Sequence, residues 1–157
     1  AGSLAVFLLL GISGHYKKAE LPEERIFQRT ILSNASDVMD VSRELEGFCE
    51  AWDADMKQQM LATMTVEEIG MAILEHGFQG RTDGYIQLTA IMQENGELEL
   101  HLRDDATTFN PIDMDTRRAS QDGDFDMDSM GVLIIKKRAK EFFYRRYQGF
   151  NTLIIRI

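Results

Sequence analysis

The hydrophobic pattern of this chain changes its period near residue 80, and this change limits the folds that the chain can adopt. Before that point, apolar residues recur at helical spacing, as at Val38, Val41 and Leu45. After it, apolar and polar residues alternate in residues 85–91 and 98–102, which is typical of strands with one buried face. Helices that precede a run of consecutive strands favour an α+β fold.

Local signals place the expected elements along the chain. Ser36 and Asp37 offer caps for the first long helix, Gly77 follows the second, and Asn95-Gly96 predicts a hairpin turn. We expect a strand at residues 27–32, helices at 37–52 and 56–76, and strands at 85–91 and 98–102. A long loop at 104–128, a third helix at 129–140 and strands at 141–147 and 151–157 follow. This order predicts a two-layer α+β sandwich, in which helices cover one face of an antiparallel or mixed sheet.

The composition excludes several classes of protein. A chain of 157 residues has the size of one domain, and a formal net charge of −9 disfavours nucleic acid as a partner. Cys49 is the only cysteine, so the chain can form neither an intrachain disulfide nor a cysteine zinc cluster. A reducing compartment, the cytoplasm, fits best. The three histidines do not have metal-ligand spacing, and we expect no metal centre built on them.

The first 26 residues differ from the rest. Residues 4–12 are nearly all apolar, but a bilayer span needs about 20 such residues. Tyr16, Lys17 and Lys18 follow closely, as at the cytoplasmic end of a membrane helix. We expect residues 1–26 to be the end of a membrane helix and a linker, and residues 27–157 to be a separate domain. A buried strand or helix of the domain is the alternative for residues 4–12.

Four short motifs carry the candidate chemistry. They are EEIGMAILEHGF at residues 67–78, RDDATTFNP at 103–111, DSMGV at 128–132 and NTLII at 151–155. Glu68, Ala72 and His76 in the first motif are spaced by four residues, so they lie on nearly one face of a helix. Taken alone, Glu68 and His76 are better explained by a solvated helix edge, and only together with the other motifs do they indicate a site.

In this order and at these spacings, the motifs resemble the ATP-binding domain of the GHKL superfamily, the histidine kinase-like ATPases. The branch that they resemble most is that of the anti-sigma-factor serine kinases. EEIGMAILEHGF, RDDATTFNP and the ending YQGFNTLIIRI look especially like the ATPase-like domains fused behind the membrane region of some bacterial MATE-type efflux transporters. The resemblance covers residues 27–157 and implies a Bergerat-type fold that binds ATP or ADP.

The resemblance implies roles for several residues. Glu68 matches the general base, which polarises a water or a substrate hydroxyl near the γ-phosphate. Asp104 matches the aspartate that accepts a hydrogen bond from the adenine amino group, and Thr152 is expected beneath the adenine. Gly131, at the start of a helix, is expected to face phosphates.

Other positions match the family's pocket or depart from its pattern. His76, Phe109 and Asn110 match residues that shape the pocket and begin the lid. The asparagine that holds Mg²⁺ in the family is replaced by Ala72, which has no oxygen ligand, although Mg²⁺ needs several oxygen ligands. The glycine after the paired aspartates is replaced by Ala106, which restricts the approach of backbone to adenine.

The stretch expected to form the lid is acidic. Its aspartates would repel a triphosphate unless a metal bridged them. They are Asp113, Asp115, Asp122, Asp124, Asp126 and Asp128. A calcium loop of the EF-hand type is disfavoured, because a glutamate at its twelfth position and flanking helices are missing.

Three functions follow as hypotheses. The first is a nucleotide-binding domain with impaired catalysis, at the cytoplasmic face of a membrane transporter that it regulates. The second is a pseudo-ATPase that binds no nucleotide and holds a partner, either its own membrane domain or a small regulatory protein. The third is an active serine kinase of the anti-sigma type, against which Ala72 argues. The kinase branch also raises the prospect of a homodimer.

Overall fold

The computed structural model describes residues 25–111 and 127–157. The expectations for the apolar residues 4–12 and for the acidic stretch at 112–126 lie outside the described residues. Within the described part, no helix is both long and apolar enough to cross a membrane.

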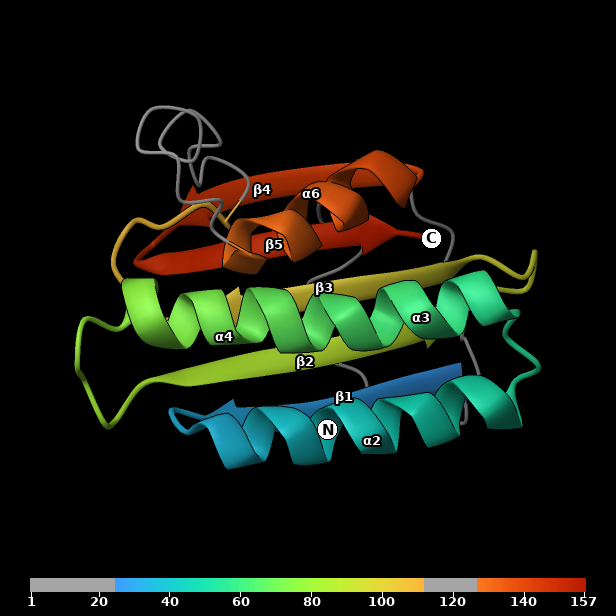
Figure 1. The fold of residues 1–157 in the computed structure, drawn as a ribbon, viewed down its shortest axis with the longest axis horizontal. Helices are drawn as coiled ribbons and strands as arrows, with labels where there is room; N and C mark the ends of the chain where they lie inside the picture. The colour runs from blue at the N-terminus through green and yellow to red at the C-terminus, as the bar shows by residue number, and fades with distance from the viewer. Residues whose placement is uncertain (1–24, 112–126) are drawn as a thin grey trace.

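Five strands form one sheet in the order β1-β2-β3-β5-β4, and each neighbouring pair is antiparallel (Figure 1). The strands are β1 (Ile26–Leu32), β2 (Tyr85–Met92), β3 (Leu98–Asp104), β4 (Glu141–Tyr147) and β5 (Phe150–Arg156). The expected strands are therefore all present. Of the two expected arrangements, antiparallel and mixed, the antiparallel one is confirmed.

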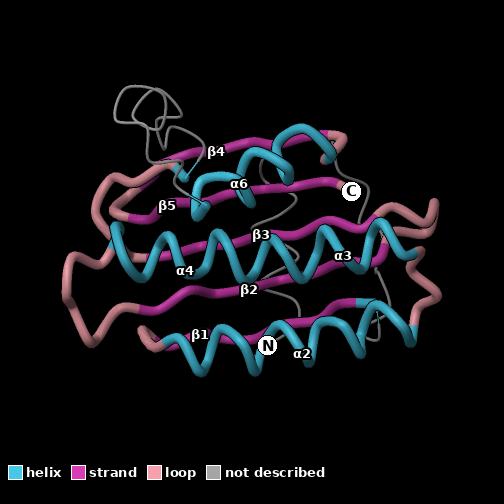
Figure 2. Tube along the Cα trace, viewed as in Figure 1, coloured by secondary structure: helices cyan, strands magenta, loops and turns pink. Residues whose placement is uncertain are grey.

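The helices of the described part all lie over the same face of the sheet (Figures 1 and 2). The first is α2 (Ala35–Ala51) and the last is α6 (Met127–Arg138). Between them, one continuous helical path consists of α3 (Met56–Met64), η2 (Thr65–Ile69), α4 (Gly70–Ala72) and η3 (Ile73–Gly77). The path from α3 to η3 runs across the middle of the sheet, between α2 and α6. The expected α+β two-layer sandwich is confirmed.

The first long helix begins two residues earlier than expected. Asn34 caps α2, because its side chain accepts a hydrogen bond of 2.8 Å from the Asp37 backbone N–H. Asp37 turns back instead, and its carboxylate accepts from the Leu32 N–H at 2.6 Å. Ser36 is thus inside the helix. The second helical path has a capping box, in which Asp55 and Gln58 exchange hydrogen bonds.

Two π-helical turns interrupt the second path, which we expected to be a regular α-helix. They cover Thr65–Ile69 and Ile73–Gly77, so each overlaps one end of the motif at residues 67–78. Single π turns within α-helices are rare and are frequent at functional sites. They also change the rotation per residue, so spacing alone does not fix the faces of Glu68 and His76.

Tight turns close both hairpins. Gly96 has a φ of 83° in the turn between β2 and β3, and Gln148 and Gly149 have φ of 49° and 82° between β4 and β5. Glycine adopts these values without the steric cost of a Cβ. Between the two hairpins, β3 pairs with β5, and this register brings Asp104 at the end of β3 beside Asn151 at the start of β5.

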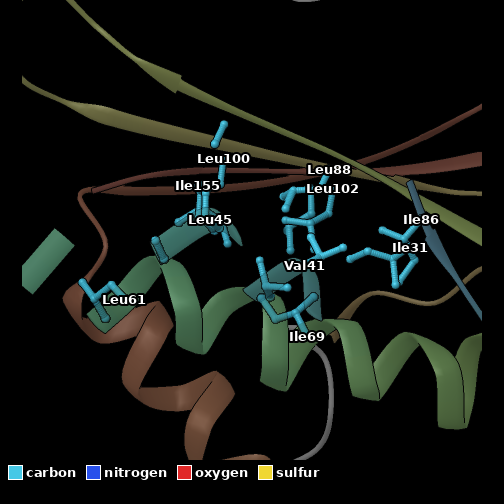
Figure 3. Packing of buried hydrophobic residues seen from close by; sticks show 14 of the residues in the cluster. Ile31, Val41, Leu45, Leu61, Ile69, Ile86, Leu88, Leu100, Leu102 and Ile155 are labelled. Atoms are coloured by element: carbon cyan, nitrogen blue, oxygen red, sulfur yellow. The ribbon is translucent and has the colours of Figure 1, made fainter. Parts of the chain in front are cut away.

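The core lies between the sheet and the helix layer (Figure 3). Val41 of α2 and Ile69 of η2 are buried there against Leu88 and Leu102, whose side chains project from neighbouring strands. Cys49 is also fully buried, and burial, with a smaller effect of Glu46, raises the pKa of its thiol to about 11. This thiol is therefore inert at neutral pH, as a packed side chain.

Candidate functional site

Glu68 and Gly131 lie in direct contact, although 63 positions separate them in the chain. A Cβ built on Gly131 would lie 2.4 Å from Cδ and 2.6 Å from Oε2 of Glu68. Real Cβ atoms do not approach other atoms so closely, so only glycine fits here without movement. The contact joins η2 to α6 and brings together two of the residues that we expected in a site.

The place of Gly131 in its helix differs from our expectation. Helix α6 begins at Met127, so Gly131 is past the first four residues, whose N–H groups lack intrahelical partners. Its role in the structure is a close approach, because the missing Cβ lets the Glu68 carboxylate reach the helix backbone.

The two neighbouring glutamates of the helix motif face different elements. The Glu67 carboxylate accepts a hydrogen bond of 2.7 Å from the hydroxyl of Ser42 on α2. The Glu68 carboxylate lies against α6 instead. The structure therefore distinguishes a helix-packing acid, Glu67, from the candidate general base, Glu68.

Ala72 is buried, with 6% of its surface exposed, yet it is not part of the main hydrophobic cluster. Its methyl group cannot ligate Mg²⁺. Among the described residues, no group of three or more histidine, cysteine, aspartate or glutamate side chains could hold a metal ion.

The end of the helix motif packs against the turn that follows β3. Thr107 donates two hydrogen bonds to the Gly77 carbonyl, from its backbone N–H at 3.3 Å and from its hydroxyl at 3.1 Å. The rings of His76 and Phe109 lie 6.0 Å apart between centroids. A Cβ on Gly77 would lie 3.1 Å from the Ala106 methyl group, so Gly77 packs tightly against the turn after β3. The expected neighbours His76, Ala106 and Phe109 do lie together.

Asp104 is the most buried acid of the site, with 3% of its surface exposed. Its Oδ1 accepts two hydrogen bonds of 2.9 Å, one from the Ala106 backbone N–H and one from the Asn151 side-chain Nδ2. Within the described residues, no hydrogen bond reaches its other oxygen, Oδ2. One half of this carboxylate is therefore anchored, and the other half retains its full capacity to accept a hydrogen bond.

Burial is the main cause that raises the pKa of Asp104, and the neighbouring Asp105 adds to it. The hydrogen bonds from Asn151 and Ala106, and the charge of Arg146, oppose this rise in pKa. Asp105 itself points away from the site, because its carboxylate binds Arg81 at 3.0 Å and accepts from the Tyr85 N–H at 3.3 Å. The paired aspartates thus have separate roles.

Thr152 does not join the other candidate residues. Neighbouring residues of a strand point to opposite faces, and Asn151, which pairs with Asp104, lies on the face covered by helices. Thr152 pairs with Arg103 and lies on the other face. Asn110 is half-buried after the turn. The residue that contacts Asp104 from the last strand is Asn151, which sequence reasoning missed.

A network of side chains surrounds Asn151. Its Oδ1 accepts from the Tyr144 hydroxyl at 2.7 Å and from the Arg146 guanidinium at 2.9 Å, and its Nδ2 donates to the Thr107 carbonyl at 2.8 Å. Arg146 also donates to the Ala106 carbonyl at 3.1 Å. Strand β4 is thereby tied to the turn after β3. Knowledge of the strand register alone could have identified Asn151 as the partner of Asp104.

Comparison with solved structures shows the same fold in proteins of low sequence identity. One is the structure of the RsbU and RsbW domains of a Mycobacterium tuberculosis protein, with a TM-score of 0.61 and 14% identity over 83% of this chain. This chain covers only 31% of that protein. Another is from the SiaB–SiaC complex of Pseudomonas aeruginosa, with a TM-score of 0.57, 14% identity, and coverage of 98% of this chain and 99% of the other.

A search of curated proteins gives no significant match. The family model of the histidine kinase-like ATPase domain matches residues 31–157, which include every element except the beginning of β1. This match extends over the helix motif, the turn after β3, α6 and the last strand. The chain therefore belongs to the histidine kinase-like ATPase domain family.

Proposed function

We propose that this chain is a degenerate nucleotide-binding domain, which binds ATP or ADP weakly and uses the bound nucleotide for regulation rather than for efficient catalysis. The observation that carries this proposal is the state of Asp104. Its Oδ1 is fixed by two donors, and its Oδ2 has no partner among the described residues, at a site that is almost fully buried. An acceptor of this kind suits the amino group of adenine.

The phosphate end of the proposed site supports the loss of catalysis. Ala72 replaces the family's metal-binding asparagine, and the Glu68 carboxylate packs against the backbone of Gly131. Without the asparagine, the protein has one ligand fewer for a Mg²⁺ ion that bridges the phosphates. Where Mg²⁺ does bind, its ligands are chiefly the nucleotide's own oxygens and water.

Calorimetric titration of the 157-residue chain with ADP, with and without Mg²⁺, tests this proposal. We expect a Kd for ADP that changes less than about twofold with Mg²⁺. The variant Ala72→Asn restores the missing ligand, and we expect Mg²⁺ to tighten its binding of ADP by about tenfold. Binding by the unchanged chain that strictly requires Mg²⁺ would contradict the proposal.

A second candidate function is a pseudo-ATPase that binds a partner and no nucleotide. The contact between Glu68 and Gly131 favours it, because the carboxylate of the candidate base packs against α6. Absence of heat on titration of the unchanged chain, with binding restored in Ala72→Asn, would select this function. Phosphate transfer by the unchanged chain to a protein serine would instead select the third hypothesis, the serine kinase.

For the partner, we propose a small regulatory protein or the chain's own transporter membrane domain. The solved SiaB structure is a complex with SiaC, which supports a protein partner for this fold. The resemblance to domains behind MATE-type transporters supports the membrane domain. The reading frame upstream of Ala1 tests the transporter: repeated apolar segments of about 20 residues support it, and a start codon just before Ala1 contradicts it.

A further inference from the structure

We propose that Asn151, held by Tyr144 and Arg146, is the positioning residue that aims Oδ2 of Asp104 at the ligand and so sets the selectivity for the purine base. This inference rests on the proposed function, because it concerns how the proposed nucleotide site reads the group at purine C6. It assigns a role to strand β4, which none of the four sequence motifs includes.

The Asn151 side chain is held in one orientation by its neighbours. Its Oδ1 lies 2.7 Å from the Tyr144 hydroxyl and 2.9 Å from the Arg146 guanidinium, both of which donate. An amide turned by half a rotation would place its NH₂ group against the Arg146 guanidinium, which has only donors, and its oxygen against the oxygens of Asp104 and Thr107. Its Nδ2 is therefore directed to Asp104 Oδ1 and to the Thr107 carbonyl.

This orientation decides which oxygen of Asp104 is left for a ligand. Oδ1 receives both the Asn151 amide and the Ala106 N–H at 2.9 Å, so the carboxylate cannot rotate without losing two hydrogen bonds. An ionised carboxylate oxygen is an acceptor only. It accepts from the 6-amino group of adenine and repels the 6-carbonyl oxygen of hypoxanthine.

Arg146 also holds the backbone of the turn that follows Asp104. It donates to the carbonyl of Ala106 as well as to Asn151 Oδ1, at 3.1 and 2.9 Å. The turn that follows Asp104 is thus held by the same guanidinium that orients the amide. Since the N–H of Ala106 also binds Asp104, a change at Arg146 acts on this carboxylate through the turn and through Asn151, whereas a change at Tyr144 acts through Asn151.

Comparison of ADP with inosine diphosphate measures the selectivity directly. ADP has an amino group at C6, whereas inosine diphosphate has a carbonyl group there, and the two also differ in protonation of the adjacent ring nitrogen. For the unchanged chain we expect ADP to bind about 10- to 100-fold more tightly, as for a hydrogen bond to a charged group. In Asn151→Leu, which has a similar shape but no donor, we expect this ratio to fall to about threefold or less.

The variant Tyr144→Phe keeps Asn151 and removes only one of its two donors. We expect it to lower the ADP preference by about two- to fivefold, because Arg146 still holds the amide. Tyr147→Phe is the matched control, since Tyr147 lies on the same strand with 61% of its surface exposed. It should leave the preference unchanged. Thermal unfolding of all variants shows which of them remain folded.

The outcomes separate this inference from the function on which it rests. Binding of neither nucleotide by the unchanged chain overturns the proposed function, and the inference with it. An unchanged chain that prefers ADP, with the full preference kept in folded Asn151→Leu and Tyr144→Phe, overturns the inference alone. If Asn151→Leu does not fold, an ADP preference that is equal in Tyr144→Phe and Tyr147→Phe overturns the inference alone.

Discussion

Glu68 and Gly131 are so closely packed that the Glu68 side chain leaves no room for a Cβ at position 131. The virtual Cβ of Gly131 is within 2.6 Å of three atoms of Glu68, and α6 otherwise packs through the buried Val132 and Ile135. At the residue scale, this contact decides how near the candidate base lies to the helix that follows the acidic stretch. A single methyl group is enough to disturb it.

We therefore expect Gly131→Ala to leave the chain about 1 kcal/mol less stable than Gly47→Ala does, because the new methyl group must displace the flexible end of the Glu68 side chain. Gly47→Ala is the control, because a Cβ at this position of α2 would meet nothing within 4 Å, and it should stabilise by about 0.5–1 kcal/mol. Urea unfolding measures both. In a background of Glu68→Ala this difference between the two variants should disappear, and a difference that persists there would contradict the contact.

Asp104 gives a second prediction at this scale, on pH. Folding raises the pKa of the Asp104 carboxyl above its ordinary value of 3.8. The free energy of unfolding therefore falls as the pH rises from 3.8 through the pKa of the folded state, because the folded state resists the loss of this proton. Asp104→Asn cannot ionise. The stability of this variant, relative to the unchanged chain, should be higher at pH 7 than at pH 3.8, the ordinary pKa of the group, by chemical denaturation. A difference that does not vary with pH would refute this.

At the scale of the elements, the start of α2 shows how a local choice among caps is decided. Asn34, Ser36 and Asp37 all have side chains that can cap a helix. Asn34 takes this role, and Asp37 is drawn to the Leu32 N–H at the end of β1. The strand-to-helix connection is thereby shortened to two residues, Ser33 and Asn34.

We expect Asn34→Ala to lower the free energy of unfolding by about 1 kcal/mol, the usual loss for an N-cap. Ser36→Ala is the matched control inside the helix, and it should change stability by less than about 0.5 kcal/mol. Thermal or urea unfolding separates the two. A larger effect at Ser36 than at Asn34 would place the helix start where the sequence alone suggested it.

Most elements were predictable, because periodicity depends on which face is buried and this chain has one core. Strands 85–91 and 98–102 were predicted within two residues of β2 and β3. The π turns at Thr65–Ile69 and Ile73–Gly77 were not, since no local signal in the sequence separates a π turn from an α-helix.

At the scale of the whole molecule, the candidate site depends on contacts that no single motif contains. Glu68 lies against Gly131 and the ring of His76 lies near that of Phe109, so residues from separate motifs meet in the fold. Asn151 was missed because it is one residue from the expected Thr152, and in a strand one residue changes the face.

The central claim is that ADP binds between the turn after β3 and α6, with Asp104 at the adenine end. Two-dimensional NMR of the 157-residue chain, titrated with ADP to millimolar concentration, tests it most directly. We predict shifts in the amide signals of Ala106, Asn151 and Gly131, with little change at Gln28 on the sheet face that the described helices leave uncovered. Shifts confined to that uncovered face, or no shifts at all, would contradict the account.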